Sequence, residues 1–231
     1  MPHVVYLCIQ SEAMAINSTQ YTALKAELDP QQVTLVAVSK TKPIADIQAL
    51  YDLGQRDFGE NYVQELVDKQ AELPTDIRWH FIGHLQSNKV KYIAPFVHLI
   101  HGVDSANLLK EISKQAVKCS RTLHCLLQVH IAQEETKFGF DAQEVGQVLQ
   151  QAYPQVSICG LMGMASFSTD TQLVAKEFAG LKQLYDAMQT QYPGLTEFDT
   201  LSMGMSADYQ LAIAQGSNMV RIGSMLFGAR G

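Results

Sequence analysis

Apolar segments of strand length alternate with helical patterns along most of the chain. Segments such as TLVAV (34–38) and LLQV (126–129) are nearly continuous in apolar residues, which is typical of parallel strands covered on both faces. The pattern predicts eight strands, over Thr34–Val38, Arg56–Gly59, His80–Ile82, Val97–Ile100, Leu123–Ile131, Val156–Leu161, Thr200–Met203 and Met219–Ile222. Helical patterns between them cover Pro43–Leu53, Tyr62–Glu72, Ala106–Cys119, Ala142–Ala152, Thr171–Gln191 and Ser206–Ala214.

Eight β/α units in a chain of 231 residues favour an α/β fold with one closed (β/α)8 barrel, the TIM barrel. A helix over residues 18–29, opened by a Ser/Thr cap, is expected before the first strand. An open doubly wound sheet is the alternative, but no G-x-G-x-x-G follows the first strand. No Pro/Gly/Ser-rich linker divides the sequence, so we expect residues 1–231 to form a single barrel domain.

Composition and charge restrict the class of protein. Hydrophobic residues make up 47% of the chain, and the formal net charge is −6 without a Lys/Arg-dense block, so nucleic acid is not an expected partner. No stretch approaches the roughly 20 apolar residues that span a bilayer. The apolar run Val4–Ile9 is too short for a secretion signal and lacks a basic leader. We therefore expect a cytoplasmic protein with no membrane partner.

The spacing of cysteines and histidines does not indicate a metal site. The four cysteines show neither a C-x-x-C pair nor zinc-ligand spacing and are expected to be reduced, mostly packed thiols: Cys8, Cys119, Cys125 and Cys159. His80 and His84 flank a strand-to-loop transition, and His98 and His101 are expected to face opposite sides of a strand. The sequence therefore predicts no metal.

The first strand ends on a lysine. Residues 33–43 read VTLVAVSKTKP, so Lys40 lies at the carboxyl end of the strand, where barrels place their active sites. A loop lysine is usually solvated, but desolvation at a barrel rim lowers its pKa and leaves a free amine that forms a Schiff base with an aldehyde. Lys42 lies two residues further on and is expected to be solvated.

The last two β/α junctions are rich in glycine and serine. They read LSMGMSAD (201–208) and VRIGSMLFG (220–228), and barrels often bind a phosphate between these two loops. Three glycines there permit close backbone approach, and two hydroxyls add donors: Gly204, Gly223, Gly228, Ser206 and Ser224. Ordinary tight turns would also explain either loop alone, but the two together indicate a phosphate site.

Three further polar residues lie at or beside strand ends. Arg221, within the eighth strand, must pair outward with a helix carboxylate or point inward to a ligand, and the nearby Gly223 and Ser224 favour the ligand. Asn61, after the second strand, could cap the helix expected to begin at Tyr62 or face a ligand, and the two roles are compatible. His84 follows the third strand.

A Schiff-base lysine, a phosphate site and a nearby arginine together suggest pyridoxal 5′-phosphate as the cofactor. The chain also resembles the pyridoxal-phosphate homeostasis proteins (the YggS/PROSC family) in order over nearly its whole length. The matching segments are VAVSKTKP (36–43), DFGENYVQE (57–65), WHFIGHLQSNK (79–89), ETKFGF (135–140), GLM (160–162), LSMGMSADYQLAI (201–213) and VRIGSMLFGAR (220–230). The resemblance implies a barrel like the N-terminal domain of alanine racemase, with Lys40 as the internal aldimine lysine.

The resemblance also implies roles for other residues. Ser206, Gly223 and Ser224 would hold the phosphate, Arg221 would face the pyridine nitrogen, and Asn61 and His84 would line the pocket beside the ring. An arginine does not donate its proton readily, so the ring would be a weakened electron sink. His130 stands where the family usually has asparagine, and MGMASF (162–167) departs from the commoner form, so neither is assigned a contact.

Two classes of function fit these features. The chain ends three residues after Gly228, which leaves no room for the C-terminal β-domain that completes the racemase site, so we expect a non-enzymatic protein with no catalytic residues. It would sequester and supply pyridoxal phosphate as a monomer, with apo forms of pyridoxal-phosphate enzymes as recipients. The alternative is a pyridoxal-phosphate-dependent amino-acid racemase or lyase. A barrel enzyme whose Lys40 attacks a phosphorylated sugar is a third, weaker hypothesis.

Overall fold

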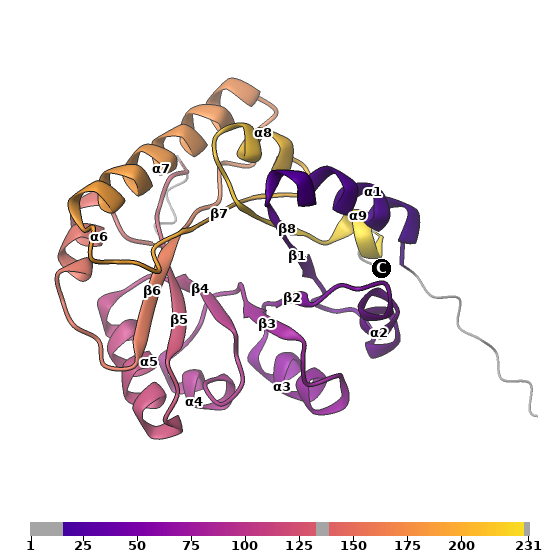
Figure 1. The fold of residues 1–231 in the computed structure, drawn as a ribbon, viewed down its shortest axis with the longest axis horizontal. Coiled ribbons are helices and arrows are strands. Elements are labelled where there is room, and N and C mark those ends of the chain that lie inside the picture. The colour runs from indigo at the N-terminus through magenta and orange to yellow at the C-terminus, as the bar shows by residue number, and fades with distance from the viewer. Residues whose placement is uncertain (1–15, 133–138, 229–231) are drawn as a thin grey trace, which may run out of the picture.

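Eight parallel strands close into a barrel in the computed structural model, which describes residues 16–132 and 139–228 (Figure 1). Each strand pairs with its neighbours in chain order, and β1 pairs with β8. The strands are β1 (Thr34–Val38), β2 (Asp57–Glu60), β3 (Arg78–Phe81), β4 (Leu99–Val103), β5 (Leu123–Gln128), β6 (Val156–Met162), β7 (Thr200–Met205) and β8 (Met219–Ile222). The predicted TIM barrel is therefore confirmed. The predictions made for Cys8 and for part of ETKFGF lie outside the described residues.

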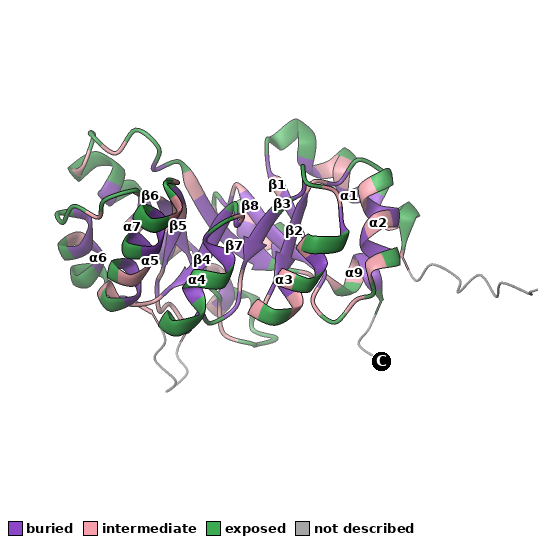
Figure 2. Cartoon of the chain, turned by 90° about the horizontal axis from the view of Figure 1, so that it is seen from below, coloured by how far each residue is buried: buried purple, intermediate pink, exposed green. Residues whose placement is uncertain are grey.

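Helices surround the barrel and bury its outer face (Figures 1 and 2). They are α1 (Ser18–Leu28), α2 (Ile44–Asp52), α3 (Val63–Glu72), α4 (Val90–Ile93), α5 (Ala106–Cys119), α6 (Ala142–Leu149), α7 (Thr171–Gln191), α8 (Tyr209–Ala214) and α9 (Ser224–Phe227). Two short 3₁₀ helices cover Asp29–Gln31 and Ser87–Lys89. Within the described ranges, no helix combines the length and the apolar character needed to cross a membrane.

Helix α5 illustrates how the sequence specifies these elements. Ser105 caps its start by accepting a hydrogen bond from the Leu108 backbone N–H at 3.3 Å. Leu108, Ile112 and Ala116 recur at helical spacing and are all buried, so one face of the helix packs against the barrel. The C-cap that follows Cys119 is Ser120, which takes a left-handed conformation with φ of 53°.

The core has two layers. The larger cluster lies between the strands and the helices, whereas a smaller cluster fills the barrel interior with Val36, Leu99, Leu126, Cys159, Met162 and Met219. Polar side chains share this interior, because His80, His101 and Ser202 are also fully or almost fully buried. The barrel interior is therefore a packed core that contains buried polar side chains as well as apolar ones.

Several predicted boundaries were wrong, for local reasons. The cap of α1 is Asn17, whose side chain accepts from the Gln20 N–H at 3.0 Å, and not a Ser/Thr. Helix α8 begins at Tyr209 instead of Ser206, because the Asp208 carboxylate accepts the Met205 N–H at 2.6 Å and holds residues 205–208 in a turn. Ser206 consequently stays in the loop. The short helix α4 was not predicted.

Candidate functional site

The site is a cleft of about 420 Å³ at the carboxyl ends of the strands. Its lining comes mainly from the loops after β1, β2, β6, β7 and β8: Val38, Lys40, Thr41, Lys42, Asn61, Ile82, Met164, Phe167, Met205, Ser206, Ala207, Arg221, Gly223, Ser224 and Gly228. Three of these residues are basic and none is acidic. The cleft therefore has the charge and the hydroxyl groups of a site for a small anion.

Lys40 lies in the cleft, half-buried, directly after β1. The residues on either side of it are anchored by carboxylates: the Ser39 hydroxyl donates to Glu60 Oε1 at 2.6 Å, and the Thr41 N–H donates to Glu65 Oε1 at 2.6 Å. Thr41 takes a left-handed conformation with φ of 62°. These bonds fix the backbone that carries the lysine.

A buried ammonium joins the two carboxylates beneath Lys40. Lys69 Nζ donates to Glu60 Oε1 at 2.7 Å, to Glu65 Oε1 at 2.7 Å and to the Ser39 carbonyl at 2.8 Å. Burial raises the pKa of Glu60, and the ion pair with Lys69 lowers it in part. Because the side chains of Glu60 and Lys69 are 0% and 6% exposed, this pair is part of the core.

The prediction that Lys42 is solvated was wrong. Its Nζ donates to the Phe227 carbonyl at 2.8 Å, and the side chain is half-buried in the lining of the cleft. Phe227 is the last residue of α9, so Lys42 ties the loop after β1 to the end of that helix. It thereby adds a second ammonium to the cleft beside Lys40.

The predicted phosphate residues meet at one side of the cleft. The Gly223 N–H donates to Ser206 Oγ at 3.3 Å, which joins the loops after β7 and β8. A Cβ at position 223 would lie 3.2 Å from both Cβ and O of Val38, so the packing there leaves little room for a side chain. Ser224 is the exposed first residue of α9 and lines the same cleft.

Asn61 lines the cleft and does not cap α3. The N-cap of that helix is Tyr62, which makes no side-chain capping bond. Among the described residues, Asn61 Oδ1 is one of two buried side-chain atoms without a hydrogen-bond partner. A buried amide oxygen in this state is costly unless a ligand or solvent satisfies it. The helix-cap alternative is therefore excluded, and the side chain is available to a bound molecule.

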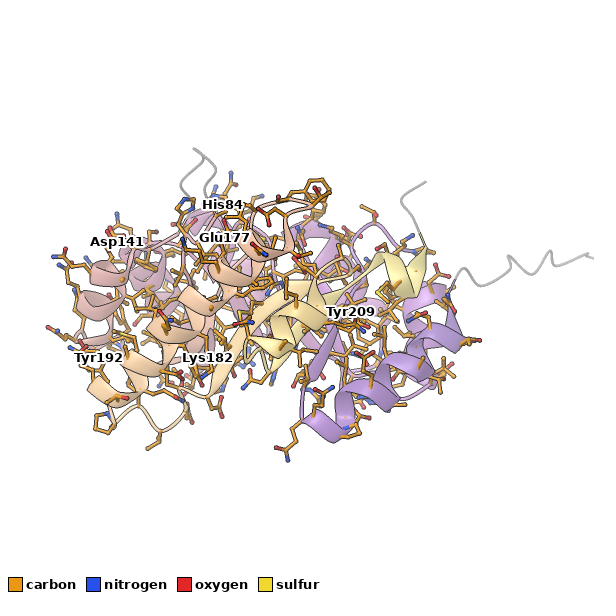
Figure 3. All side chains as sticks on the ribbon, turned by 90° about the horizontal axis from the view of Figure 1, so that it is seen from above. His84, Asp141, Glu177, Lys182, Tyr192 and Tyr209 are labelled. Atoms are coloured by element: carbon orange, nitrogen blue, oxygen red, sulfur yellow. The ribbon has the colours of Figure 1, made fainter. Side chains whose placement is uncertain are left out.

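The structure does not bring His84 into the lining of the cleft. Its ring is 59% exposed, with Nδ1 3.1 Å from Asp104 Oδ2. Figure 3 shows it at the upper edge of the molecule, well separated from Tyr192 and Lys182. The residues after Met162, which were assigned no contact, do contribute: Met164 and Phe167 both line the cleft, and Phe167 is 97% exposed. His130 is half-buried and not among the lining residues.

Arg221 points inward and is 4% exposed. Its Nη1 donates to the Ser202 hydroxyl at 2.6 Å and to the Ser202 carbonyl at 3.0 Å, and its Nη2 donates to the Gly163 carbonyl at 3.1 Å. None of these acceptors is a carboxylate. Burial lowers the pKa of Arg221 to about 10, and Asp208 counters this shift in part. The guanidinium is thus a cation held by neutral groups at the floor of the cleft.

A hydrogen-bonded chain runs from Arg221 through the barrel interior. Ser202 Oγ lies 3.2 Å from His101 Nδ1, and His101 Nε2 lies 2.9 Å from His80 Nδ1. His80 Nε2 then lies 3.0 Å from Asp57 Oδ1, at the start of β2. If both rings are neutral, every group in this relay donates to the next one toward Asp57, so all its bonds are satisfied.

Two members of the relay, His101 and Asp57, have shifted pKa values. Burial of His101 lowers its pKa well below the ordinary value, so its ring is neutral at neutral pH. Burial alone would raise the pKa of Asp57, but hydrogen bonds from Arg78 and His80 outweigh it and hold that pKa well below its usual range. Arg78 pairs with both carboxylate oxygens of Asp57. The sequence analysis missed the relay because its members lie on five different strands.

Comparison with known proteins shows consistent similarity. The family model described as alanine racemase, N-terminal domain, matches residues 10–231. The chain is 39% identical over 218 residues to the pyridoxal phosphate homeostasis protein of Vibrio alginolyticus, covering 91% of this chain and 92% of that protein. It is 41% identical over 218 residues to the protein of that name from Synechocystis sp., covering 91% and 97%.

Solved structures show the same similarity. PipY of Synechococcus elongatus with pyridoxal phosphate bound has a TM-score of 0.82 at 37% identity, over 94% of this chain and 100% of that one. An alanine racemase from Bartonella henselae has a TM-score of 0.68 at 16% identity, over 88% of this chain and 56% of that one. The racemase therefore shares the fold alone.

Proposed function

Because the chain belongs to the pyridoxal phosphate homeostasis proteins, within the alanine racemase N-terminal domain family, we propose that its cleft binds pyridoxal 5′-phosphate and that the protein sequesters and supplies this cofactor. The observation that carries the proposal is a cleft that joins Lys40 to two further cations and three hydroxyls, with no carboxylate in its lining. An aldehyde that carries a phosphate needs both an amine and an anion site.

The residues of the cleft fit the parts of the cofactor. Ser206, Gly223 and Ser224 would hold the phosphate, and Lys40 would bind the aldehyde carbon covalently. Asn61 Oδ1, buried and without a partner, would receive a hydrogen bond from the bound molecule. When bound, the cofactor supplies an aldehyde that reacts with amines and a ring that withdraws electrons.

Arg221 would face the ring nitrogen. Its pKa of about 10 still leaves the guanidinium charged at neutral pH, so it donates a hydrogen bond without giving up its proton. A ring nitrogen that stays unprotonated withdraws electrons weakly, which disfavours the chemistry of a racemase. The Ser202–His101–His80–Asp57 relay orients the guanidinium from below, because Ser202 accepts from it at 2.6 Å.

A non-enzymatic role is supported by the lining of the cleft. Racemisation needs an acid/base on each face of the substrate. Among the described lining residues, lysine is the only residue type of ordinary acid/base function, with no Asp, Glu, His, Tyr or Cys. We therefore propose sequestration and supply without turnover, with apo forms of pyridoxal-phosphate enzymes as recipients and the chain acting as a cytoplasmic monomer. The alternative, a racemase or lyase, would show turnover with free amino acids.

Borohydride reduction tests the proposal. The purified chain mixed with pyridoxal phosphate should develop a visible absorption band, and after reduction peptide mass mapping should find the label on Lys40. Lys42→Ala is the matched control, since Lys42 lines the same cleft and should not carry the label. The loaded protein, as sole cofactor source, should then reactivate an apo-enzyme. Labelling chiefly at Lys42, or turnover of order 1 per second on an amino acid, would contradict the proposal.

A further inference from the structure

A second cavity, of about 260 Å³, opens at the amino end of the barrel, away from the cleft. Its lining consists of His98, Leu99, His124, Cys159, Glu197, Asp199, Thr200 and Met219. Two carboxylates, two imidazoles and a thiol are present, and no lysine or arginine lines it. The charge of this cavity is thus opposite to that of the cleft, and it favours a cation.

Three different ligand atoms converge in this cavity. One atom each of His124, Cys159 and Glu197 lies within 4.8 Å of the other two, and the Cys159 Sγ to His124 Nδ1 distance is 3.4 Å. Ligands bound to zinc at ordinary bond lengths are about 3.3–3.8 Å apart in a tetrahedron. The thiol and the imidazole therefore already have the required spacing, and a Glu197 carboxylate oxygen lies within 4.8 Å of both ligand atoms.

Ser157 holds two of these groups in place. Its hydroxyl donates to Glu197 Oε2, and its Oγ lies 3.6 Å from Cys159 Sγ. The strand pairing explains the convergence: His124 lies beside Ser157 in the β5–β6 ladder, and Cys159 occupies the register shift that follows, with its Sγ near the Ser157 hydroxyl. Groups that orient ligands in this way are a regular feature of metal sites.

A neighbouring cluster of Asp57, His80 and His98 has similar spacing, but the ligand atoms of Asp57 and His80 already take part in hydrogen bonds and an ion pair. Both ring nitrogens of His80 are engaged, by Asp57 at 3.0 Å and by His101 at 2.9 Å. Asp57 is also paired with Arg78. A metal there would have to displace Arg78 from Asp57 and break the relay, so the comparison favours the cluster around Cys159.

We propose that His124, Cys159 and Glu197 form a zinc site at the amino end of the barrel. Nitrogen, sulfur and oxygen ligands in a tetrahedral arrangement suit Zn²⁺, and water would complete the fourth position. The Cys159 thiol releases its proton to solvent when the ion binds, and His124 binds as the neutral ring. The site uses no residue of the cleft, so its test is independent of the test of pyridoxal phosphate binding.

Titration with Zn²⁺ and Co²⁺ tests the site in the full chain. One equivalent of zinc should bind, and cobalt should give the intense visible bands of a tetrahedral ion together with a thiolate charge-transfer band. Cys159→Ala should abolish the charge-transfer band and weaken zinc binding by more than about 100-fold, whereas Ser157→Ala, which removes only the orienting hydroxyl, should keep the band and weaken binding about 10–100-fold. Cys119→Ser, at a half-exposed thiol at the end of α5, is the matched control and should change neither.

A second variant keeps the test decisive if Cys159→Ala disturbs the barrel interior. His124 is only half-buried, so His124→Gln should fold normally and also lose zinc affinity. The proposal is overturned if the wild-type chain does not bind micromolar zinc, or if the cobalt charge-transfer band persists in Cys159→Ala. It is equally overturned if folded Cys159→Ala and His124→Gln bind zinc as tightly as the wild type.

Discussion

The cleft and the second cavity lie at opposite ends of the barrel and are lined by side chains of opposite charge. The cleft at the carboxyl end is lined by Lys40, Lys42 and Arg221 with no acidic residue, whereas the cavity at the amino end is lined by Glu197 and Asp199 with no lysine or arginine. The carboxyl end is built chiefly from loops, which can be long and rich in glycine. The amino end uses side chains within or just before the strands.

This difference teaches how the barrel keeps two kinds of ligand apart. The lining of the cleft attracts an anion and that of the second cavity attracts a cation. The barrel interior between the two cavities contains polar groups as well as apolar side chains, because the relay from Arg221 to Asp57 crosses it. A cation at one end of the relay and a carboxylate at the other polarise its bonds in the same direction.

The largest expected change in the free energy of unfolding comes from the ion pair of Glu60 and Lys69, beneath the cleft. Lys69→Met removes the cation and leaves the Glu60 carboxylate, 0% exposed, without its partner. We expect a loss of about 3–5 kcal/mol in the free energy of unfolding, measured by urea denaturation at pH 8. The loss should be smaller at pH 5, because burial raises the pKa of Glu60 and protonation relieves the charge.

The matched control for that variant is the double substitution Lys69→Met with Glu60→Gln. It removes the buried charge together with its partner and should recover part of the lost stability. A loss below about 1 kcal/mol in Lys69→Met alone, which is the range of surface pairs, would show that this pair is not part of the core.

The relay should give the next largest effect. His101→Ala leaves the Ser202 hydroxyl and His80 Nδ1 without their shared partner in the barrel interior. We expect a loss of about 1–3 kcal/mol in the free energy of unfolding, the range for a buried polar group left unpaired. Thr122→Ala, at an exposed position directly before β5, serves as a control and should cost less.

The same histidine predicts the pH dependence of stability. In the folded chain burial holds the pKa of His101 well below 6.5, whereas in the unfolded chain it titrates near that value. The unfolded state therefore binds more protons as the pH falls below about 6.5, and the free energy of unfolding decreases. His98, whose pKa burial lowers to about 4, acts in the same direction. A flatter profile in His101→Asn between pH 6.5 and 5 would confirm the assignment, and an unchanged profile would contradict it.

At the carboxyl end, smaller changes should weaken ligand binding without unfolding the chain. Ser206→Ala and Ser224→Ala each remove one hydroxyl from the cleft and should reduce pyridoxal phosphate affinity by about 0.5–3 kcal/mol. Ser87→Ala, at an exposed position in the 3₁₀ helix before α4, is the control. Equilibrium titration of absorbance measures the affinity. If the double variant binds as tightly as the wild type, the phosphate lies elsewhere.

The barrel and most of the cleft could be predicted from the sequence because both depend on short local segments. Parallel strands buried on both faces appear in a sequence as apolar runs. Loops that bind phosphate in barrels are typically marked by glycine and serine directly after a strand. Lys40, Ser206, Arg221 and Gly223 were therefore found from local segments, and the structure brings all four to one cleft. His84, which the resemblance assigns to the pocket, is not among the residues that line the cleft, and its position after a strand does not determine the direction of its side chain.

The amino end could not be predicted in that way. His124, Cys159 and Glu197 are 35 or more residues apart, and no spacing rule for metal ligands connects them. Only the pairing of β5 with β6 and of β6 with β7 brings these residues side by side. The relay was invisible for the same reason, since His101 and Ser202 are 101 residues apart. A site built from one local segment can be predicted from the sequence, whereas a site assembled from several strands requires the pairing register of those strands.

The smallest expected effect is the coupling between the two ends. Ser206 follows β7 and Cys159 lies beside its start, so the two positions are separated by roughly 20 Å at 3.3 Å per strand residue. They share no hydrogen-bond partner among those described. The stability changes of Ser206→Ala and Cys159→Ala should therefore add within about 0.5 kcal/mol in the double variant, and Ser206→Ala should bind zinc as the wild type does.

The matched contrast is the pair His101→Ala and Ser202→Ala, whose side chains lie 3.2 Å apart within the relay. Their effects should not add, because the first substitution already removes the bond that the second would break. Urea denaturation of the six single and double variants measures both cycles under one condition. If the distant pair showed a coupling as large as that of the relay pair, the two ends would be one cooperative unit, and the separation of anion and cation sites argued above would be wrong.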